Sequence, residues 1–326
     1  MPNYTTREFR DSDYEPLTEI GNREHPPHRQ NSAESWQRMD ARREPQEVFI
    51  KIVVPDPDTD KAIAYLSATD LNTSPGKFAD VCGFGIQVAH AHRRQGIGAM
   101  LYELALEFAE KRGSKRLVTG FIEHTPDEPA IGFLTKRGFD EQERERPSHL
   151  NLADFDLAPF VREIAEAEKH VRIISYADVP DTEENRRKIY DLFVPIIYDI
   201  PRRDTQPFEM DPFETWQKWT IERPEWNPSL MLLTEAPNGD WVGLTHIMPK
   251  LENTVGMQWL TGVHKDWRGR SIATALKARS YANAKAQDRT IIITENHEDN
   301  GPMLAVNTKF GFVPDAPEVR WNKVLA

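Results

Sequence analysis

The chain has almost no cysteine and no long apolar run. Its 326 residues include one cysteine, Cys82, which excludes an intramolecular disulfide and is typical of a reducing compartment. No apolar run approaches the roughly 18 residues that a membrane-spanning helix needs. The N-terminus also lacks the charged start and apolar core of a secretory signal. We therefore expect a cytoplasmic protein with no membrane partner.

Basic charge is scarce as well. The sequence has 41 lysines and arginines against 52 aspartates and glutamates, which gives a formal net charge of −11. This balance argues against nucleic acid as the main partner. A content of 39% hydrophobic and 29% charged residues indicates a globular protein, and the length suggests two domains of ordinary size.

Two short basic turns stand at matching places in the two halves of the sequence. The first lies in residues 88–98 (VAHAHRRQGIG) and the second in residues 263–273 (VHKDWRGRSIA), so that Arg93 and Arg268 are 175 positions apart. Each turn follows a strand-like segment and precedes a segment with helical periodicity. Such a turn directs backbone N–H groups and a helix dipole at an anion. The duplication predicts two sites for a phosphate-bearing ligand.

The residues of both turns are the candidate ligands of a diphosphate. Glycine allows close approach of the backbone, and arginine adds charge-assisted hydrogen bonds. Ser271 replaces the glycine of the first turn; its hydroxyl can contact a phosphate or cap the helix, so we expect weaker binding there rather than none. The candidates are Arg93, Arg94, Gln95, Gly96, Ile97 and Gly98 in the first copy, and Arg268, Gly269, Arg270, Ser271, Ile272 and Ala273 in the second.

Around each turn the same order of elements is expected. A short strand and a polar helical region come first, three strands follow, and after the turn come a helix, a strand and a helix that ends in Gly-Phe. The strands next to the turns are expected at 81–88 and 116–123, and at 256–263 and 290–294. We expect an N-terminal domain over residues 1–152, a linker helix over 153–170 and a C-terminal domain over 171–326.

Both halves resemble the acetyl-coenzyme A-dependent N-acetyltransferase superfamily called GNAT. Its cofactor motif, Gln/Arg-x-x-Gly-x-Gly/Ala, is matched by Arg93, Gly96 and Gly98, whereas the second copy departs from it at Ser271. The chain is similar to two-domain members of the mycothiol synthase type. The resemblance implies an α+β fold of two tandem mixed sheets in which the fourth and fifth strands splay apart. Pantetheine would lie in each gap, along the backbone of Val88 or Val263.

The resemblance also implies a function. Acetyl-CoA would be the cosubstrate, and a small-molecule primary amine would attack its thioester directly. Two alternatives stay open at this point: a non-catalytic protein that binds or senses acyl-CoA, and an N-acyltransferase that uses another acyl donor. A monomer or a homodimer would both be compatible with this reading.

The late helix distinguishes the two halves. The superfamily often carries a tyrosine there, four residues before the glycine of the Gly-Phe pair, as the acid for the leaving thiolate. This chain has Leu134 in the first half and Asn307 in the second, with Asn300 upstream. Asn307 can donate a hydrogen bond to the sulfur or the pantetheine arm. We therefore expect catalysis in the second half and a cofactor-holding or structural role for the first.

Three residues are candidates for the proton acceptor, each with an ordinary structural alternative. Glu295 follows a strand, Glu252 follows a strand-like run, and His246 lies inside a strand and has a side chain suited to proton transfer near neutrality. Glu252 and Glu295 are equally compatible with solvated surface acids, and His246 with a structural histidine. No metal site is expected, because His90 and His92 lack nearby cysteine or carboxylate partners.

Overall fold

A computed structural model describes residues 4–73, 78–125, 128–200, 209–251 and 253–325. The chain forms two compact units, each described here by itself. The first unit contains Met1–Arg144 and Pro317–Ala326, and the second contains Glu145–Arg203 and Met210–Ala316. Neither unit is one uninterrupted half of the sequence.

The first unit is a mixed sheet with helices on both faces. Its strands lie in the order β1-β2-β3-β4-β5-β14-β6. Its strands are β1 (Arg7–Glu8), β2 (Phe49–Pro55), β3 (Ala62–Asp70), β4 (Val81–Val88), β5 (Arg116–Ile122), β6 (Asp140–Glu145) and β14 (Glu318–Val324). Its α-helices are α1 (Tyr14–Asn22), α2 (Ala33–Ala41), α3 (Ile97–Lys111) and α4 (Pro129–Thr135).

The pattern of buried residues explains how α3 and α1 pack. Four-residue spacing places Ile97, Leu101, Ala105 and Ala109 on one stripe of α3, and this stripe lies in the main core of the unit. On the other face, Leu17 of α1 packs in a smaller cluster with β2 and β3. The sheet is therefore buried on both sides by elements that the helical periodicity predicts.

The second unit repeats this architecture. Its strands lie in the order β13-β7-β12-β11-β10-β9-β8. Its strands are β7 (Ser148–Asn151), β8 (Arg172–Ser175), β9 (Met231–Glu235), β10 (Trp241–Pro249), β11 (Val255–Val263), β12 (Ile291–Thr294) and β13 (Val313–Pro314). Its α-helices are α5 (Val161–Glu168), α6 (Glu183–Tyr198), α7 (Phe213–Thr220), α8 (Ile272–Ala286) and α9 (Gly301–Lys309).

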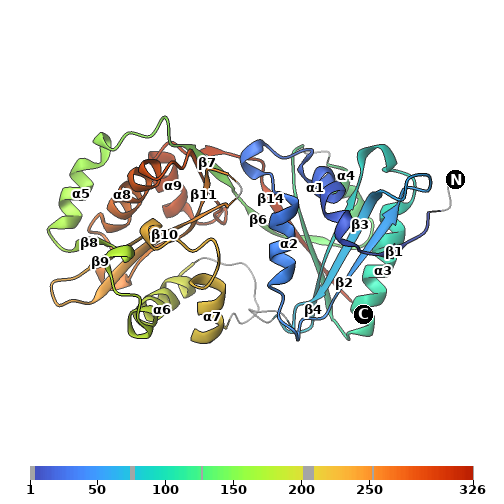
Figure 1. Cartoon of the computed structure of the whole chain (residues 1–326), viewed down its shortest axis with the longest axis horizontal. Helices are drawn as coiled ribbons and strands as arrows, with labels where there is room; N and C mark the ends of the chain where they lie inside the picture. Colours follow the sequence, from blue (N-terminus) through green and yellow to red (C-terminus); the bar gives the residue numbers. More distant parts are fainter. Residues whose placement is uncertain (1–3, 74–77, 126–127, 201–208, 252, 326) are drawn as a thin grey trace. The chain divides into compact units, whose positions relative to one another are not determined.

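Two helical layers enclose the second sheet. Figure 1 shows α8 and α9 on one side of its strands and α6 and α7 on the other. The expected linker helix forms as α5 and belongs to the core beneath α8, where the ring of Phe160 stacks on Phe310 with centroids 4.2 Å apart. The fold class predicted from the sequence, two mixed sheets of tandem GNAT type, is confirmed.

The two halves of the sequence each contribute one strand to the other half's sheet. β14, the last strand of the chain, lies between β5 and β6 in the first sheet, and all seven of its residues from Glu318 to Val324 pair antiparallel with β5. In the second sheet the corresponding place, between β12 and β13, is taken by β7 from the first half of the sequence. Each sheet is thus completed by a segment from the other half of the sequence.

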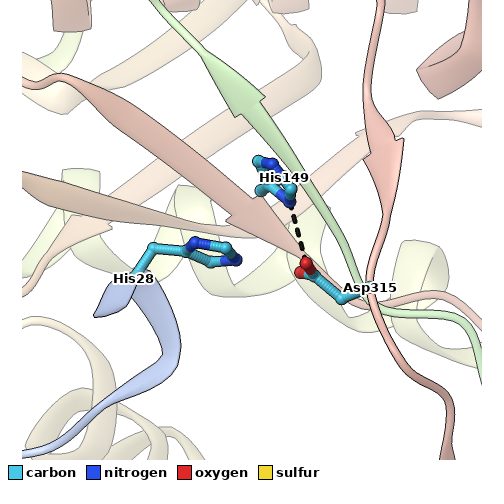
Figure 2. A group of neighbouring side chains, drawn as sticks. All are labelled: His28, His149 and Asp315. Carbon is cyan, nitrogen blue, oxygen red and sulfur yellow. Dashed lines mark hydrogen bonds and ion pairs between the residues drawn. The ribbon is translucent and has the colours of Figure 1, made fainter. Parts of the chain in front are cut away.

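An ion pair holds β7 in its place within the second unit. Nδ1 of His149, on β7, lies 2.8 Å from Oδ1 of Asp315, which follows β13 (Figure 2). The backbone N–H of Asp315 also donates to the carbonyl of Pro147 at 2.9 Å. The exchanged strand is therefore fixed by side-chain and backbone contacts as well as by its ladder with β12. Among the described residues, no helix combines the length and apolarity needed to cross a bilayer.

Candidate functional site

Each sheet opens beside its basic turn. β4 and β5 run parallel and pair only over Val81–Gly83 and Arg116–Val118, although β4 continues to Val88. Likewise, β11 and β12 pair over Val255–Met257 and Ile291–Ile293, whereas β11 continues to Val263. The parted strands at these two places agree with the splay that the family resemblance implies, and β4 and β11 each end directly at a basic turn.

An arginine braces each turn against the end of the parted strand. Nε of Arg93 donates to the carbonyl of Val88 at 3.1 Å, and Nε of Arg268 donates to the carbonyl of Val263 at the same distance. The two guanidinium groups also meet a carboxylate near the end of the first helix of their half: Arg93 pairs with Glu24 at 3.2 Å, and Arg268 pairs with Asp199. Both arginines thus have a structural role besides the expected contact with phosphate.

The two turns share an unusual backbone conformation, but glycine occupies a different position in each. In the first, Arg94 and Gly96 have positive φ values of 63° and 90°. In the second, Gly269 and Ser271 have values of 78° and 59°. Each turn therefore has two left-handed residues two positions apart, with glycine at one of them. The second turn keeps the shape of the first although its sequence differs. In each turn one residue with a Cβ, Arg94 or Ser271, adopts the left-handed conformation, which costs about 1–2 kcal/mol.

Both helices begin without a capping side chain. Gly96 and Ser271 are the N-cap residues of α3 and α8, and no side-chain hydrogen bond caps either helix. The hydroxyl of Ser271 thus does not cap α8, although the sequence allowed that role. The first amides of a helix have no intrahelical acceptor, so these N-termini present donors to an anion. Below them, Ile97 and Ile272 are buried and anchor the helices in their cores.

The remaining residues of the turns are held locally. Gln95 accepts a hydrogen bond from the hydroxyl of Tyr4 at 2.6 Å and donates to the carbonyl of Ala91 at 3.1 Å. Arg270 donates to the carbonyl of Asp266 at 2.7 Å, and its guanidinium lies 5.0 Å from the ring centroid of Trp267. These contacts leave both turns well defined without a ligand.

The small residues of the first helical turn meet the core. An added Cβ at Gly98 would lie 3.6 Å from Phe133, an ordinary van der Waals distance. Ala273, the corresponding residue of the second copy, packs against the core of its unit. A Cβ is therefore accommodated at this position in both copies.

A β-bulge interrupts β11 just beyond its last pair with β12. In the ladder with β10, His246 faces Leu260 and Ile247 faces Gln258, so Trp259 has no partner residue. The buried amide of Gln258 donates to the carbonyls of His246 and Leu260 at 2.9 and 3.0 Å. The ladder between β3 and β4 has no such shift. Bulges are frequent beside active sites, and no sequence pattern predicted this one.

The late helices differ in polarity. In the second unit the side chain of Asn300 caps α9 by accepting from the N–H of Met303 at 3.4 Å. Asn307 is only 3% exposed, and its Oδ1 accepts a hydrogen bond from Nζ of Lys277 at 2.6 Å. In the first unit the corresponding residue, Leu134, is buried in an apolar core. Sequence reasoning missed Lys277, although a lysine within the apolar pattern of α8 was a detectable signal.

Burial makes Lys277 an unusual lysine. It is 1% exposed, and within the described part of the chain no carboxylate forms an ion pair with its Nζ. Desolvation lowers its pKa from 10.5 to about 7. The neutral amine of Lys277 is therefore accessible at a much lower pH than that of a lysine in water.

This lowered pKa predicts a particular pH dependence of stability. Between about pH 7 and 10.5 the unfolded chain binds a proton at Lys277 that the folded chain releases, so the folded state gains stability as the pH rises through this window. Relative to a Lys277→Met variant, the wild type should become progressively more stable from pH 7 to pH 9. Urea denaturation of both proteins at three pH values measures the difference between their free energies of unfolding. A difference that does not change with pH would contradict the prediction.

The three expected proton acceptors lie in different environments. His246 is fully buried with its ring centroid 4.8 Å from that of Trp226, and burial, aided by Arg223, lowers its pKa to about 3. Its imidazole is therefore neutral and weakly basic near neutral pH. Glu295 is exposed and directly follows β12. Glu252 lies outside the described residues.

Comparison with known proteins agrees with this geometry. Residues 7–139 match the family model described as the Acetyltransferase (GNAT) family. Over 99% of this chain and 98% of the other, the structure is similar to that of a tandem GNAT protein from the clavulanic acid biosynthesis pathway, with a TM-score of 0.76 and 18% sequence identity. The chain thus has a GNAT match over residues 7–139 and, over almost its whole length, the fold of a tandem GNAT protein.

A second solved structure supports the same two-domain fold. It is a GCN5-related N-acetyltransferase from Sphaerobacter thermophilus, with a TM-score of 0.75 and 16% identity over 99% of this chain and 96% of that one. No curated protein sequence matches this chain significantly. The family that residues 7–139 match is one of acyltransferases, which take their acyl group from an acyl-CoA.

Proposed function

We propose that the protein is an acetyl-CoA-dependent N-acetyltransferase that acts on a small-molecule primary amine. The main support is the repeated arrangement in which a parted strand runs into a left-handed turn and an uncapped helix N-terminus. In this arrangement the free amides of α3 or α8 bind the diphosphate, and the edge of β4 or β11 near Val88 or Val263 lies along the pantetheine arm. The N-terminal partial charge of a helix stabilises an anion by about 0.3–1 kcal/mol at an exposed site.

The second copy is the catalytic one in this proposal. It alone combines a bulge in its parted strand with polar side chains on its late helix, at Asn300 and Asn307. Along the sequence, residues 1–152 would form a cofactor-holding or structural domain, 153–170 a linker helix and 171–326 the catalytic domain. The strand exchange then adds a segment of the other half to each sheet.

The reaction requires one bond to form and one to break. The amine nitrogen attacks the thioester carbonyl, the carbon–sulfur bond breaks, the amine loses a proton and the thiolate gains one. In this proposal Asn307 donates a hydrogen bond to the leaving sulfur, and Glu295, which is exposed, is the proton acceptor. Glu252 stays a second candidate for this role. His246 could serve only in a complex that raises the pKa of its imidazole from the low value that burial imposes.

The acceptor is expected to be cationic or polar, in keeping with the acidic balance of the chain. An amino sugar, an aminoglycoside antibiotic, an amino acid and a peptide N-terminus represent the chemical classes that satisfy this condition. Each offers a primary amine that is small enough to enter beside a bound thioester.

A thiol-release assay tests the proposal. The full chain is incubated with acetyl-CoA and each amine of the panel, and the free thiol and the acylated amine are measured. We expect both products with at least one acceptor. Propionyl-CoA and longer acyl-CoAs in parallel test the identity of the acyl group. Tight CoA binding in calorimetry without transfer from any donor would contradict the proposal and favour an acyl-CoA sensor.

A further inference from the structure

The buried Lys277–Asn307 pair is the strongest feature that the proposed reaction leaves unexplained. Lys277 lies on α8, five residues after the helix begins, and Asn307 lies on α9. Nζ of Lys277 lies 2.6 Å from Oδ1 of Asn307 and 3.5 Å from the sulfur of Met303. The ring centroids of Tyr281 and Phe312 are 5.9 and 5.8 Å from Nζ. Removing a lysine from water without a carboxylate partner is costly.

The hydrogen bond determines which way the Asn307 carboxamide is turned. Nζ of Lys277 donates to Oδ1 of Asn307, and the ammonium form of lysine, which has N–H donors and no acceptor, selects this oxygen over Nδ2. The other end of the group, Nδ2, is buried and has no hydrogen-bond partner among the described residues. An unpaired buried donor costs about 1–3 kcal/mol. A donor oriented in this way is available to a bound acceptor atom.

The first unit provides an internal comparison. Tyr102 stands 175 positions before Lys277, at the equivalent place on α3, and its hydroxyl accepts a hydrogen bond from Lys323 at 2.9 Å. At the equivalent of Asn307 the first unit has Leu134, which has no polar side-chain atom. The lysine and the asparagine therefore occur together in one copy and are both absent from the other, as expected if they act as a pair.

We propose that Lys277 is a positioning residue that holds Oδ1 of Asn307 so that Nδ2 donates to the sulfur of the acyl thioester. This inference rests on the proposed function of the second copy. As the carbon–sulfur bond breaks, negative charge grows on the sulfur, and a fixed N–H donor in a site without water stabilises that charge more than it stabilises the bound thioester. Lys277 itself does not touch the reacting atoms.

A double-mutant cycle tests the coupling in the full chain. The four proteins are the wild type, Lys277→Met, Asn307→Ala and the double variant. We expect kcat to fall about 100-fold in Asn307→Ala, as for the loss of one preorganised donor, and about tenfold in Lys277→Met, whereas the KM for acetyl-CoA changes by less than about threefold. The double variant should be no slower than Asn307→Ala, because Lys277 acts only through Asn307. Losses that multiply would overturn the proposal.

Stability separates positioning from a structural role. Lys277→Met removes a buried amine and should melt at the same temperature as the wild type or higher, although its kcat is lower. Asn307→Asp keeps a partner for Lys277 but removes the N–H donor, so it should stay folded and lose kcat as Asn307→Ala does. A Lys277→Met protein that loses stability in proportion to its activity would contradict positioning.

Two outcomes distinguish this inference from the proposed function. If the wild type transfers no acyl group, the proposed function fails and the inference fails with it. If the wild type is active and Lys277→Met keeps its full kcat, the inference alone fails. Tyr102→Phe is the matched control, because it alters the equivalent position of the first copy and should lower kcat by less than about twofold.

Discussion

Replacing Ser271 with aspartate is expected to lower kcat/KM for acetyl-CoA about 100-fold, which corresponds to ~2.7 kcal/mol. Ser271 is the left-handed N-cap of α8, so a carboxylate there would lie beside the amides that bind the diphosphate. Aspartate tolerates the left-handed conformation better than most residues, and serine already bears a Cβ, so little added strain is expected. Steady-state kinetics with varied acetyl-CoA gives the result, and calorimetry with CoA shows whether binding is lost.

Gly96→Asp is the matched control for this change. Gly96 is the equivalent left-handed N-cap of the first copy, so the two variants introduce the same charge at the same place in two copies of one turn. If the second copy is catalytic, Gly96→Asp should lower kcat/KM by no more than about threefold. The reverse order of effects would assign catalysis to the first copy. Ile272, also in the turn, is unsuitable for this test because it is buried in the core.

Replacing Gly262 with alanine is expected to destabilise the second unit by about 3 kcal/mol, at the upper end of ordinary overpacking. Gly262 lies near the end of β11, and a Cβ there would be 2.1 Å from Cγ2 of Ile196 on α6. Ile196 is itself buried, so α6 would have to move away from the sheet. Thermal unfolding should show a decrease in Tm of roughly 6–12 °C, at 2–4 °C per kcal/mol for a unit of this size.

A second substitution checks the cause. Ile196→Ala removes the atoms that the new Cβ would meet, so the double variant should lose less stability than the sum of the two single losses. Gly132 provides the control, because an added Cβ there meets nothing within 4 Å in α4. Gly132→Ala should raise stability by about 0.5–1 kcal/mol. Equal losses of stability in Gly262→Ala and Gly132→Ala would exclude close packing as the reason for a glycine at position 262.

The sequence predicted the site more completely where the chain repeats a local pattern. A strand, a basic turn and a helix within about 20 residues depend on local interactions, so Val81–Val88, the turn after it and α3 could be inferred. The two residues with positive φ in each turn were harder to predict, because glycine occupies different positions in the two turns. A non-glycine residue such as Ser271 gives little warning that its φ is positive.

Features that depend on distant contacts could not be predicted. The alternation that buries Val319 and Trp321 predicts a strand but not the sheet that it enters, since its ladder with β5 joins residues nearly 200 positions apart. For the same reason no sequence pattern predicted that Lys277 would contact Asn307. The proton acceptor is likewise undetermined by spacing, because the roles of Glu295 and His246 depend on a bound acceptor.

The exchanged strand also has a consequence for biosynthesis. When the ribosome has made residues 1–152, β5 and β6 exist but the strand that lies between them has not been translated, because β14 is the last strand of the chain. The N-terminal sheet must therefore wait, with two open edges, until the distant segment Glu318–Val324 has been translated. Such edges pair readily with other chains, so the nascent protein is exposed to aggregation during the interval before β14 emerges.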